Sequence, residues 1–234
     1  MPSGAARLGF RFINASPPLP DPEEPIEQFD NLGFEQGISG WTVAATRIRF
    51  GGLSVLAGFP TPVDPLPNPF GSPGDATSVD QLPNFRYTLD TVDKPPLGEV
   101  QSMHLYMGDI QFGVVNEGAS MFGPAIYSNF FVNFDAGDSC SFDWKALPGP
   151  GGTSSGDAYN IYAYMVEQTT GNYITLLRAA GANSTAGTTW STRTVNIDTA
   201  GAYKFVFVAG SWDSTYGTVI GGQMLIDNIR RIQP

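Results

Sequence analysis

The strongest constraint on the fold lies in the last hundred residues, where four segments alternate aromatic or β-branched residues with smaller or polar ones. Such residues fit a pleated, half-buried surface. Clusters of Gly, Asp, Ser, Asn or Pro that can turn the chain bound each segment. We therefore expect four β-strands, at residues 139–146, 158–167, 202–212 and 222–232.

Weaker strand patterns precede and separate these four, and no stretch has helical periodicity. They cover residues 41–50, 53–57, 85–89, 100–107, 110–115, 126–134, 173–178 and 190–197. Regularly spaced strands joined by short turns favour an antiparallel sandwich. The prediction is an all-β fold, an antiparallel jelly-roll-like β-sandwich with an extended N-terminal arm and a proline-rich insertion.

Two proline-rich stretches set the expected domain organisation. Residues 1–30 form an arm, because the five prolines of residues 16–27 allow neither helix nor central strand. The arm is either a disordered tail or a strap on a neighbouring subunit. Residues 31–234 form a single sandwich domain. Its residues 58–97 contain nine prolines, and we expect them to project as an insertion with at most one short hairpin-like element.

Charge and hydropathy restrict the partners and the location. The formal net charge of −10 disfavours nucleic acids and anionic membrane surfaces. We expect no transmembrane segment and no secretory signal, because no apolar run is long enough for either. The low charge and the many Gly, Ser, Thr, Asn and aromatic residues resemble proteins found outside cells. Without an export signal, this composition fits a processed chain, export by another route, or a virion protein released by lysis. Met1 favours the virion, which is an extracellular particle.

The reactive residue types are few. Cys140 is the only cysteine, so no intrachain disulfide can form, and alternation with Phe142 and Trp144 predicts that it is a buried small hydrophobe. His104 is the only histidine and lies in the middle of an expected strand, which favours a satisfied sheet-face residue over a catalytic one. The usual zinc and copper sites are therefore excluded. A pair of acids could still hydrolyse a glycoside, but none is marked, and we expect no enzyme.

Two short motifs lie near the beginning and the end of the sandwich domain's sequence. Asn31-Leu-Gly-Phe-Glu35-Gln-Gly is followed by Gly40-Trp41, and Leu225-Ile-Asp227-Asn228-Ile229 lies near the end of the sequence. Together they resemble the opening and closing strands of galactose-binding-like carbohydrate-binding modules. The resemblance implies that these strands meet at a structural Ca²⁺. Its ligands would be the Glu35 and Asp227 side chains, with carbonyls near Asn31 or Gly33. Alternatively, the two carboxylates cap turns and bind no metal.

A second resemblance covers about residues 117–232, half of the chain. Its motifs include Gly123-Pro-Ala125, Ser141-Phe-Asp-Trp-Lys-Ala146 and Phe205-Val-Phe-Val-Ala-Gly-Ser-Trp-Asp213. They are similar to sandwich domains of bacterial surface proteins and phage structural proteins. The resemblance implies a non-enzymatic role with other virion proteins and copies of itself as partners, or with a cell-surface glycan.

Sugar binding would require exposed aromatic rings beside polar groups. Trp212, next to the turn at residues 213–217, is the best candidate. Tyr162 and Tyr164 share one face of their strand, so they are free to bind if the Tyr159 face points inward, and belong to the core if it does not.

The leading functional interpretation is a structural or adhesive protein on the surface of a phage particle, either a capsid decoration or a tail or fibre component, forming a homo-oligomer. The alternative is a calcium-stabilised carbohydrate-binding module. A glycoside hydrolase or lyase is the third class.

Overall fold

The computed structural model describes residues 31–44, 46–50, 78–81, 85–96, 100–108, 110–111, 119–149, 157–182, 185–213, 218–219 and 221–234. Every regular element in these ranges is a β-strand, and all paired strands run antiparallel. No helix in the described part of the chain is long and apolar enough to cross a membrane.

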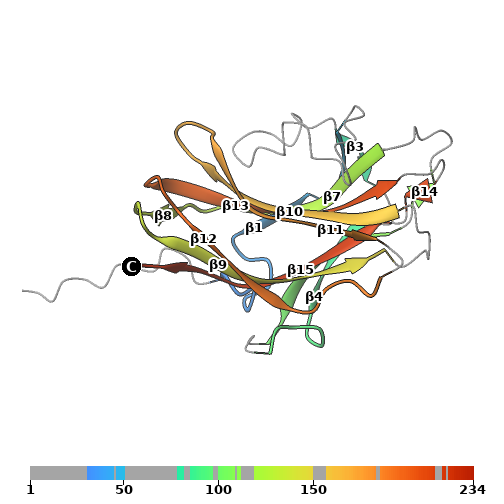
Figure 1. The fold of residues 1–234 in the computed structure, drawn as a ribbon, viewed down its shortest axis with the longest axis horizontal. Helices are drawn as coiled ribbons and strands as arrows, with labels where there is room; N and C mark the ends of the chain where they lie inside the picture. Colours follow the sequence, from blue (N-terminus) through green and yellow to red (C-terminus); the bar gives the residue numbers. More distant parts are fainter. Residues whose placement is uncertain are drawn as a thin grey trace, which may run out of the picture.

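The strands form two sheets that stack face to face, with β10, β11 and β13 on one side and β9 and β15 on the other (Figure 1). The larger sheet has the order β11 (Tyr173–Ala182), β10 (Asp157–Glu167), β13 (Gly201–Asp213), β7 (Ala119–Ser128), β2 (Thr46–Phe50) and β3 (Ser78–Gln81). In it, β1 (Trp41–Ala44) also pairs with β7, and β8 (Val132–Phe134) with β13.

The smaller sheet has five strands, and its central strand is the last one in the sequence. Its order is β12 (Ser191–Asn196), β9 (Ser139–Pro148), β15 (Gly222–Ile232), β5 (Ser102–Met107) and β4 (Phe85–Asp90). A separate short pair joins β6 (Ile110–Gln111) to β14 (Thr218–Val219). The predicted jelly-roll-like β-sandwich is confirmed.

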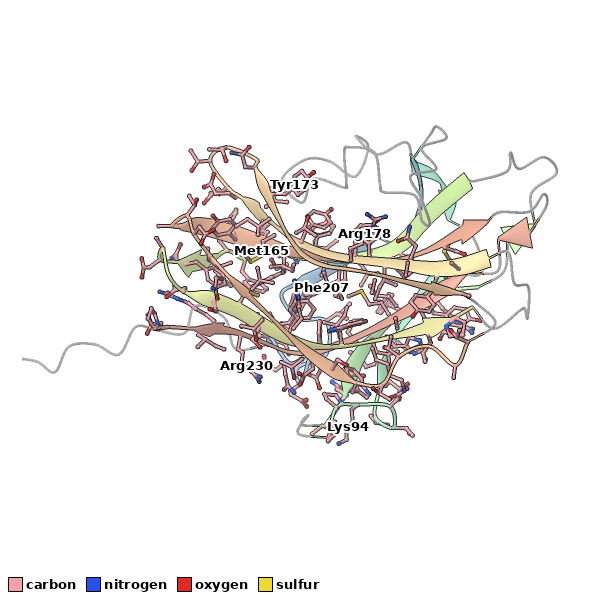
Figure 2. The ribbon with its side chains drawn as sticks, in the orientation of Figure 1. Lys94, Met165, Tyr173, Arg178, Phe207 and Arg230 are labelled. Carbon is pink, nitrogen blue, oxygen red and sulfur yellow. The ribbon has the colours of Figure 1, made fainter. Side chains whose placement is uncertain are left out.

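The core fills the space between the sheets with alternate residues of the facing strands, among them Phe142 of β9 and Phe207 of β13 (Figure 2). These two rings meet edge to face with centroids 5.5 Å apart. Each such ring that leaves water contributes roughly 1.5–3 kcal/mol to stability. Cys140 lies in the same core, as predicted, and burial raises the pKa of its thiol to about 12. Trp41 is also a core residue, and Trp144 packs at the core edge.

Strand β7 begins at Ala119, seven residues before the predicted start at residue 126. The prediction failed because Pro124 interrupts the alternating pattern and cannot donate a ladder hydrogen bond. In the structure Pro124 lies where the pairing of β7 with β13 shifts register, between the Phe122–Gly210 and Ala125–Val208 pairs. An irregularity of this kind is where a sheet accommodates proline. The predicted segment 126–134 is also divided, because β8 is a separate strand.

The stretch 58–97, expected to project as an insertion, supplies an edge strand to each sheet. β3 pairs with β2 in the larger sheet and β4 pairs with β5 in the smaller one, so the two do not form a hairpin with each other. The high proline content led us to predict a projecting insertion, but edge strands tolerate prolines near them. The predicted strand at 53–57 and the arm at residues 1–30 lie outside the described residues.

The loop before β1 contacts β15, so the first and last segments of the domain's sequence lie side by side. Ile229 donates its backbone N–H to the Leu32 carbonyl across 3.4 Å. The side chain of Asn31 organises the loop by donating to the carbonyls of Gly37 and Ser39. The resemblance to carbohydrate-binding modules implied that the first and last strands meet; here the loop before β1, rather than β1 itself, contacts β15.

Candidate functional site

The outer face of the smaller sheet is polar, and its side chains lie in rows because antiparallel partners face the same side. One row crosses four strands and consists of Arg86, Tyr106, Gln223 and Leu147; we call it the Arg86 row. The next row consists of Thr88, His104, Leu225 and Lys145. Core residues such as Leu105 and Met224 alternate with these positions on the opposite side of the same strands.

Among the described residues of this face, those of the Arg86 row are less covered than the row that contains the buried Leu225. Arg86 is exposed, and its guanidinium carbon lies 4.1 Å from the centre of the half-buried Tyr106 ring. Gln223 is fixed at both ends, because its Nε2 donates to the Pro148 carbonyl at 2.7 Å and its Oε1 lies 2.7 Å from His104 Nε2. The row therefore combines an aromatic ring, an aliphatic side chain and oriented polar groups on a rigid sheet.

His104 of β5 links Gln223 of the Arg86 row to Asp90 at the end of β4. Its Nε2 meets Gln223 Oε1, and its Nδ1 lies 3.7 Å from Asp90 Oδ2. For Asp90, partial burial acts to raise the pKa, but the N–H groups of Asp93 and Val92 and the nearby His104 outweigh it, so the pKa is lowered overall. The prediction of a satisfied sheet-face histidine is confirmed.

A loop covers the other end of the polar face. Within residues 91–96, Asp93 accepts a hydrogen bond from Lys145 Nζ at 2.6 Å and from Trp190 Nε1 at 2.8 Å. Its carbonyl also accepts from Ser102 Oγ at 2.7 Å. Leu225, which lies between His104 and Lys145 on the sheet, is consequently fully buried. A ligand on this face would therefore meet the Arg86 row first.

The residues predicted to bind calcium come together at the loop before β1. A Cβ placed on Gly33 would lie 3.5 Å from Asp227 Oδ1 and 3.9 Å from Glu35 Cγ. Asp227 is completely buried, at a register shift in β15 where Asn228 has a φ of 51°. Glu35 Oε1 accepts the N–H groups of Val100 and Gln101, at 2.8 and 3.3 Å.

These contacts fit part of a calcium site. Asp227 and Glu35 come from distant segments and both lie near Gly33, and carboxylate and carbonyl oxygens are the ligands that calcium prefers. Asn31 has another role: its amide donates to two carbonyls, its Oδ1 accepts from Gln36 N–H, and its carbonyl accepts from Trp41 Nε1. Within the described ranges, no cluster of three or more Asp, Glu, His or Cys side chains could hold a metal.

The aromatic residues predicted to bind sugar lie on the larger sheet. The Tyr159 face of β10 points into the core, so Tyr162 and Tyr164 lie on the outer face, yet their side chains are only 3% and 1% exposed. They belong to a second apolar cluster with Ala125, Val166, Val206 and Val208. Burial raises the pKa of Tyr162 to about 12 and that of Tyr164 well above its ordinary value. In this structure neither ring is presented to a ligand.

Trp212 is a strand residue of β13 that pairs with Ala158 and Ser120, but its side chain lies outside the described part of the structure. Trp190 is half-buried, and its Nε1–H donates to Asp93.

The acids that face each other across β9 and β15 are Asp143 and Asp227. Both are buried, and Asp143 accepts hydrogen bonds from Thr192 Oγ1 at 2.5 Å and Asn228 Nδ2 at 2.8 Å. A glycosidase needs two carboxyls that reach the substrate. This pair supports the strand junction instead.

Sequence reasoning did not find the Arg86 row. Alternation places Arg86 with Thr88 and His104 with Tyr106, but it does not say which residues of distant strands lie opposite. The required signal is strand register, which depends on pairing between residues far apart in the sequence, such as Tyr106 and Gln223, 117 residues apart.

Comparisons with known proteins concern the fold. No protein-family model and no curated protein sequence matches the chain. TmCBM61 in complex with β-1,4-galactotriose is similar at 12% identity and a TM-score of 0.39, over 89% of this chain and 99% of that one. The Caldicellulosiruptor saccharolyticus module CBM27-1, in complex with mannohexaose, has 16% identity and a TM-score of 0.35, over 64% and 82% of the respective chains.

A phage protein is also among the similar structures. The enzymatically active domain of bacteriophage CBA120 tailspike protein 4 has 14% identity and a TM-score of 0.39. The match covers 88% of this chain and 21% of the tailspike chain. The fold itself, a jelly-roll-like β-sandwich, follows from the strand pairing of this chain, as the sequence predicted.

Proposed function

We propose that this chain is a non-enzymatic glycan-binding β-sandwich module and that the Arg86 row is its binding surface. The observation that carries the proposal is the arrangement of Arg86, Tyr106 and Gln223 in one open row across three strands of the smaller sheet.

The chemistry of this row suits a saccharide. Sugars present hydroxyl groups that need oriented hydrogen-bond partners, and C–H faces that pack on apolar surface. The row supplies a guanidinium, a phenol, and the aliphatic side chain of Leu147. Gln223 is held from both sides, so the surface is ordered before the ligand arrives, which lowers the entropic cost of binding.

The state of the nearby acids favours binding over catalysis. Asp90 is engaged by backbone N–H groups and His104, and Asp93 by Lys145 and Trp190. Asp143 and Asp227 are buried in the strand junction. Among the described residues of this face, these contacts leave the acids poorly placed to protonate a leaving group or to attack a sugar.

A structural calcium ion is part of the proposal. The Glu35 and Asp227 carboxylates would hold it, with a carbonyl of the loop near Gly33, and the ion would cross-link the loop before β1 to β15. The setting that we propose is adhesive, on the surface of a phage particle among other virion proteins and copies of the same chain. That setting rests on the sequence interpretation.

A glycan array tests the binding function. We expect saturable binding by the purified chain that is lost in Tyr106→Ala, because this substitution removes the ring at the centre of the row. Tyr173→Ala is the matched control, since Tyr173 is an exposed tyrosine on the larger sheet. Absence of binding to every glycan, or equal binding by Tyr106→Ala and the unmodified chain, would contradict the proposal.

A further inference from the structure

The charge of Arg86 has no partner among the described carboxylates. Ion pairs among the described residues include those of His104 with Asp90, Lys145 with Asp93, and Arg231 with Asp135 and Asp138. Arg86 takes part in none of them, although the chain has 22 acidic and only 12 basic residues. An exposed guanidinium is always charged at physiological pH and keeps five N–H donors.

The nearest described acid on the same strand does not compensate this charge. Asp90 follows Arg86 by four positions, about 13 Å along a strand that rises about 3.3 Å per residue. This separation exceeds the Debye length of about 8 Å at physiological ionic strength. Asp90 is moreover already engaged with His104 and two backbone N–H groups.

The acceptors beside Arg86 are also engaged. Gln223 Oε1 pairs with His104 Nε2, and the Pro148 carbonyl accepts from Gln223 Nε2. The groups that remain for a ligand include the guanidinium donors, the second N–H of Gln223 Nε2, and the hydroxyls of Tyr106 and the exposed Thr88. A surface in which donors predominate selects a ligand rich in acceptors.

The position of the guanidinium defines which acceptor fits. Stacking on Tyr106 at 4.1 Å restricts the side chain and leaves the N–H edges of the planar fork for a partner. Two parallel N–H groups match the two oxygens of a carboxylate. We infer, on the basis of the proposed function, that the glycan bound at the Arg86 row is acidic and that Arg86 binds the carboxylate of one of its sugars.

The net charge of −10 restricts where on this chain an acidic glycan can bind. An acidic surface repels a polyanion at most positions, so binding has to come from a local site rather than from general attraction. Arg230 provides a matched control, because it is exposed on the same sheet and pairs with Ser141, seven residues along β15 from Gln223 of the Arg86 row. Arg86→Gln and Arg230→Gln therefore remove the same charge at different places.

The test is isothermal titration calorimetry with paired probes. The acidic probes are hexamers of galacturonate, glucuronate and mannuronate, together with sialyllactose. Their neutral partners are the carboxyl-reduced hexamers and lactose. We expect one acidic probe to bind at least tenfold more tightly than its neutral partner. We expect Arg86→Gln to remove this preference and Arg86→Lys to restore it only in part, since lysine keeps the charge without the fork. Arg230→Gln should retain it.

Several outcomes would overturn the inference. If neutral probes bind as tightly as acidic ones, and Arg86→Gln has no effect, the row binds glycans without an acidic group and the proposed function stands alone. If Arg230→Gln weakens binding as much as Arg86→Gln does, the attraction is not local. Tighter binding of a sulfated hexamer would refute the carboxylate assignment. If no probe binds and the glycan array is also blank, both proposals fail.

Discussion

The Trp190 indole donates its Nε1–H to the Asp93 carboxylate across 2.8 Å, although 97 residues separate the two in the chain. The second carboxylate oxygen of Asp93 accepts from Lys145 Nζ at 2.6 Å. One side chain thus joins the 91–96 loop to strand β9 and to the segment that leads into β12. This junction closes one end of the polar face and leaves the Arg86 row open at the other.

The Asp93 junction should be measurable in unfolding experiments. Asp93→Ala removes two charge-assisted hydrogen bonds, and we expect it to lower the free energy of unfolding by about 2 kcal/mol, a value reduced for partial solvent screening. Urea denaturation should show a lower midpoint with an unchanged slope. The control is Asp198→Ala, at an exposed aspartate after β12. Equal midpoints for the two variants would mean that the junction contributes nothing.

The turn after β10 should make stability depend on acid pH. Glu167 accepts hydrogen bonds from the N–H groups of Thr169 and Thr170 and from the Thr170 hydroxyl, which lower its pKa to about 2. Because the folded pKa lies below the ordinary value of 4.5, the turn stabilises the fold above pH 4.5. That contribution is lost as the pH falls towards 2.

NMR titration of the Glu167 carboxyl group checks this prediction directly. The Glu167→Gln variant should also lose less stability than the unmodified chain between pH 4.5 and pH 2, since the amide does not titrate. A Glu167 pKa near 4.5 in the folded chain would refute the prediction.

Chelation should reveal the structural calcium ion. An ion present at a hundred times its dissociation constant stabilises the folded state by about 2.7 kcal/mol. For a domain of this size, that corresponds to a melting temperature roughly 5–10 °C higher. We expect EDTA to abolish this increment in the unmodified chain. In Asp227→Asn and Glu35→Gln the melting temperature should not respond to calcium at all. Identical melting curves of the unmodified chain with calcium and with EDTA would exclude the ion.

Two glycines with positive φ should differ sharply in their tolerance of alanine. Gly221, at φ 90°, precedes β15, and a Cβ there would overlap the Met107 carbonyl group. Gly171, at φ 72°, has open space where its Cβ would lie. Gly171→Ala should therefore cost only the conformational strain of about 1–2 kcal/mol. Gly221→Ala must also displace backbone, and we expect a larger loss in urea denaturation. Similar losses for both variants would contradict the close approach of Gly221 to the end of β5.

Strands with strong alternation could be predicted because the pattern follows from burial of one face. The predicted segment 158–167 is one residue shorter than β10, and residues 222–232 coincide with β15. The start of β7 could not be predicted, since Pro124 is compatible with a strand only at the register shift opposite β13, and that shift depends on a partner more than 80 residues later. The pattern at residues 85–89 was recognised and is β4, but its place beside β5 at the edge of the smaller sheet has the same non-local dependence and was not predicted.

The candidate site was less predictable than the fold for the same reason. Glu35, Gly33 and Asp227 were grouped by resemblance, and the structure brings them together. Tyr162 and Tyr164 show the limit of alternation: it places them on one face of their strand, but it cannot say which face points outward or that the outer face holds a second buried cluster. Such a cluster depends on the side chains of neighbouring strands rather than on the pattern within one strand.

The central place of β15 in the smaller sheet sets an order of events during synthesis. Strands β5 and β9 both pair with β15, so neither gains that partner until the ribosome has released residues 222–232. Until then the nascent chain carries two unpaired strand edges, which are templates for association with other chains. Chaperone capture and aggregation during translation should therefore concentrate in the interval before the last strand emerges.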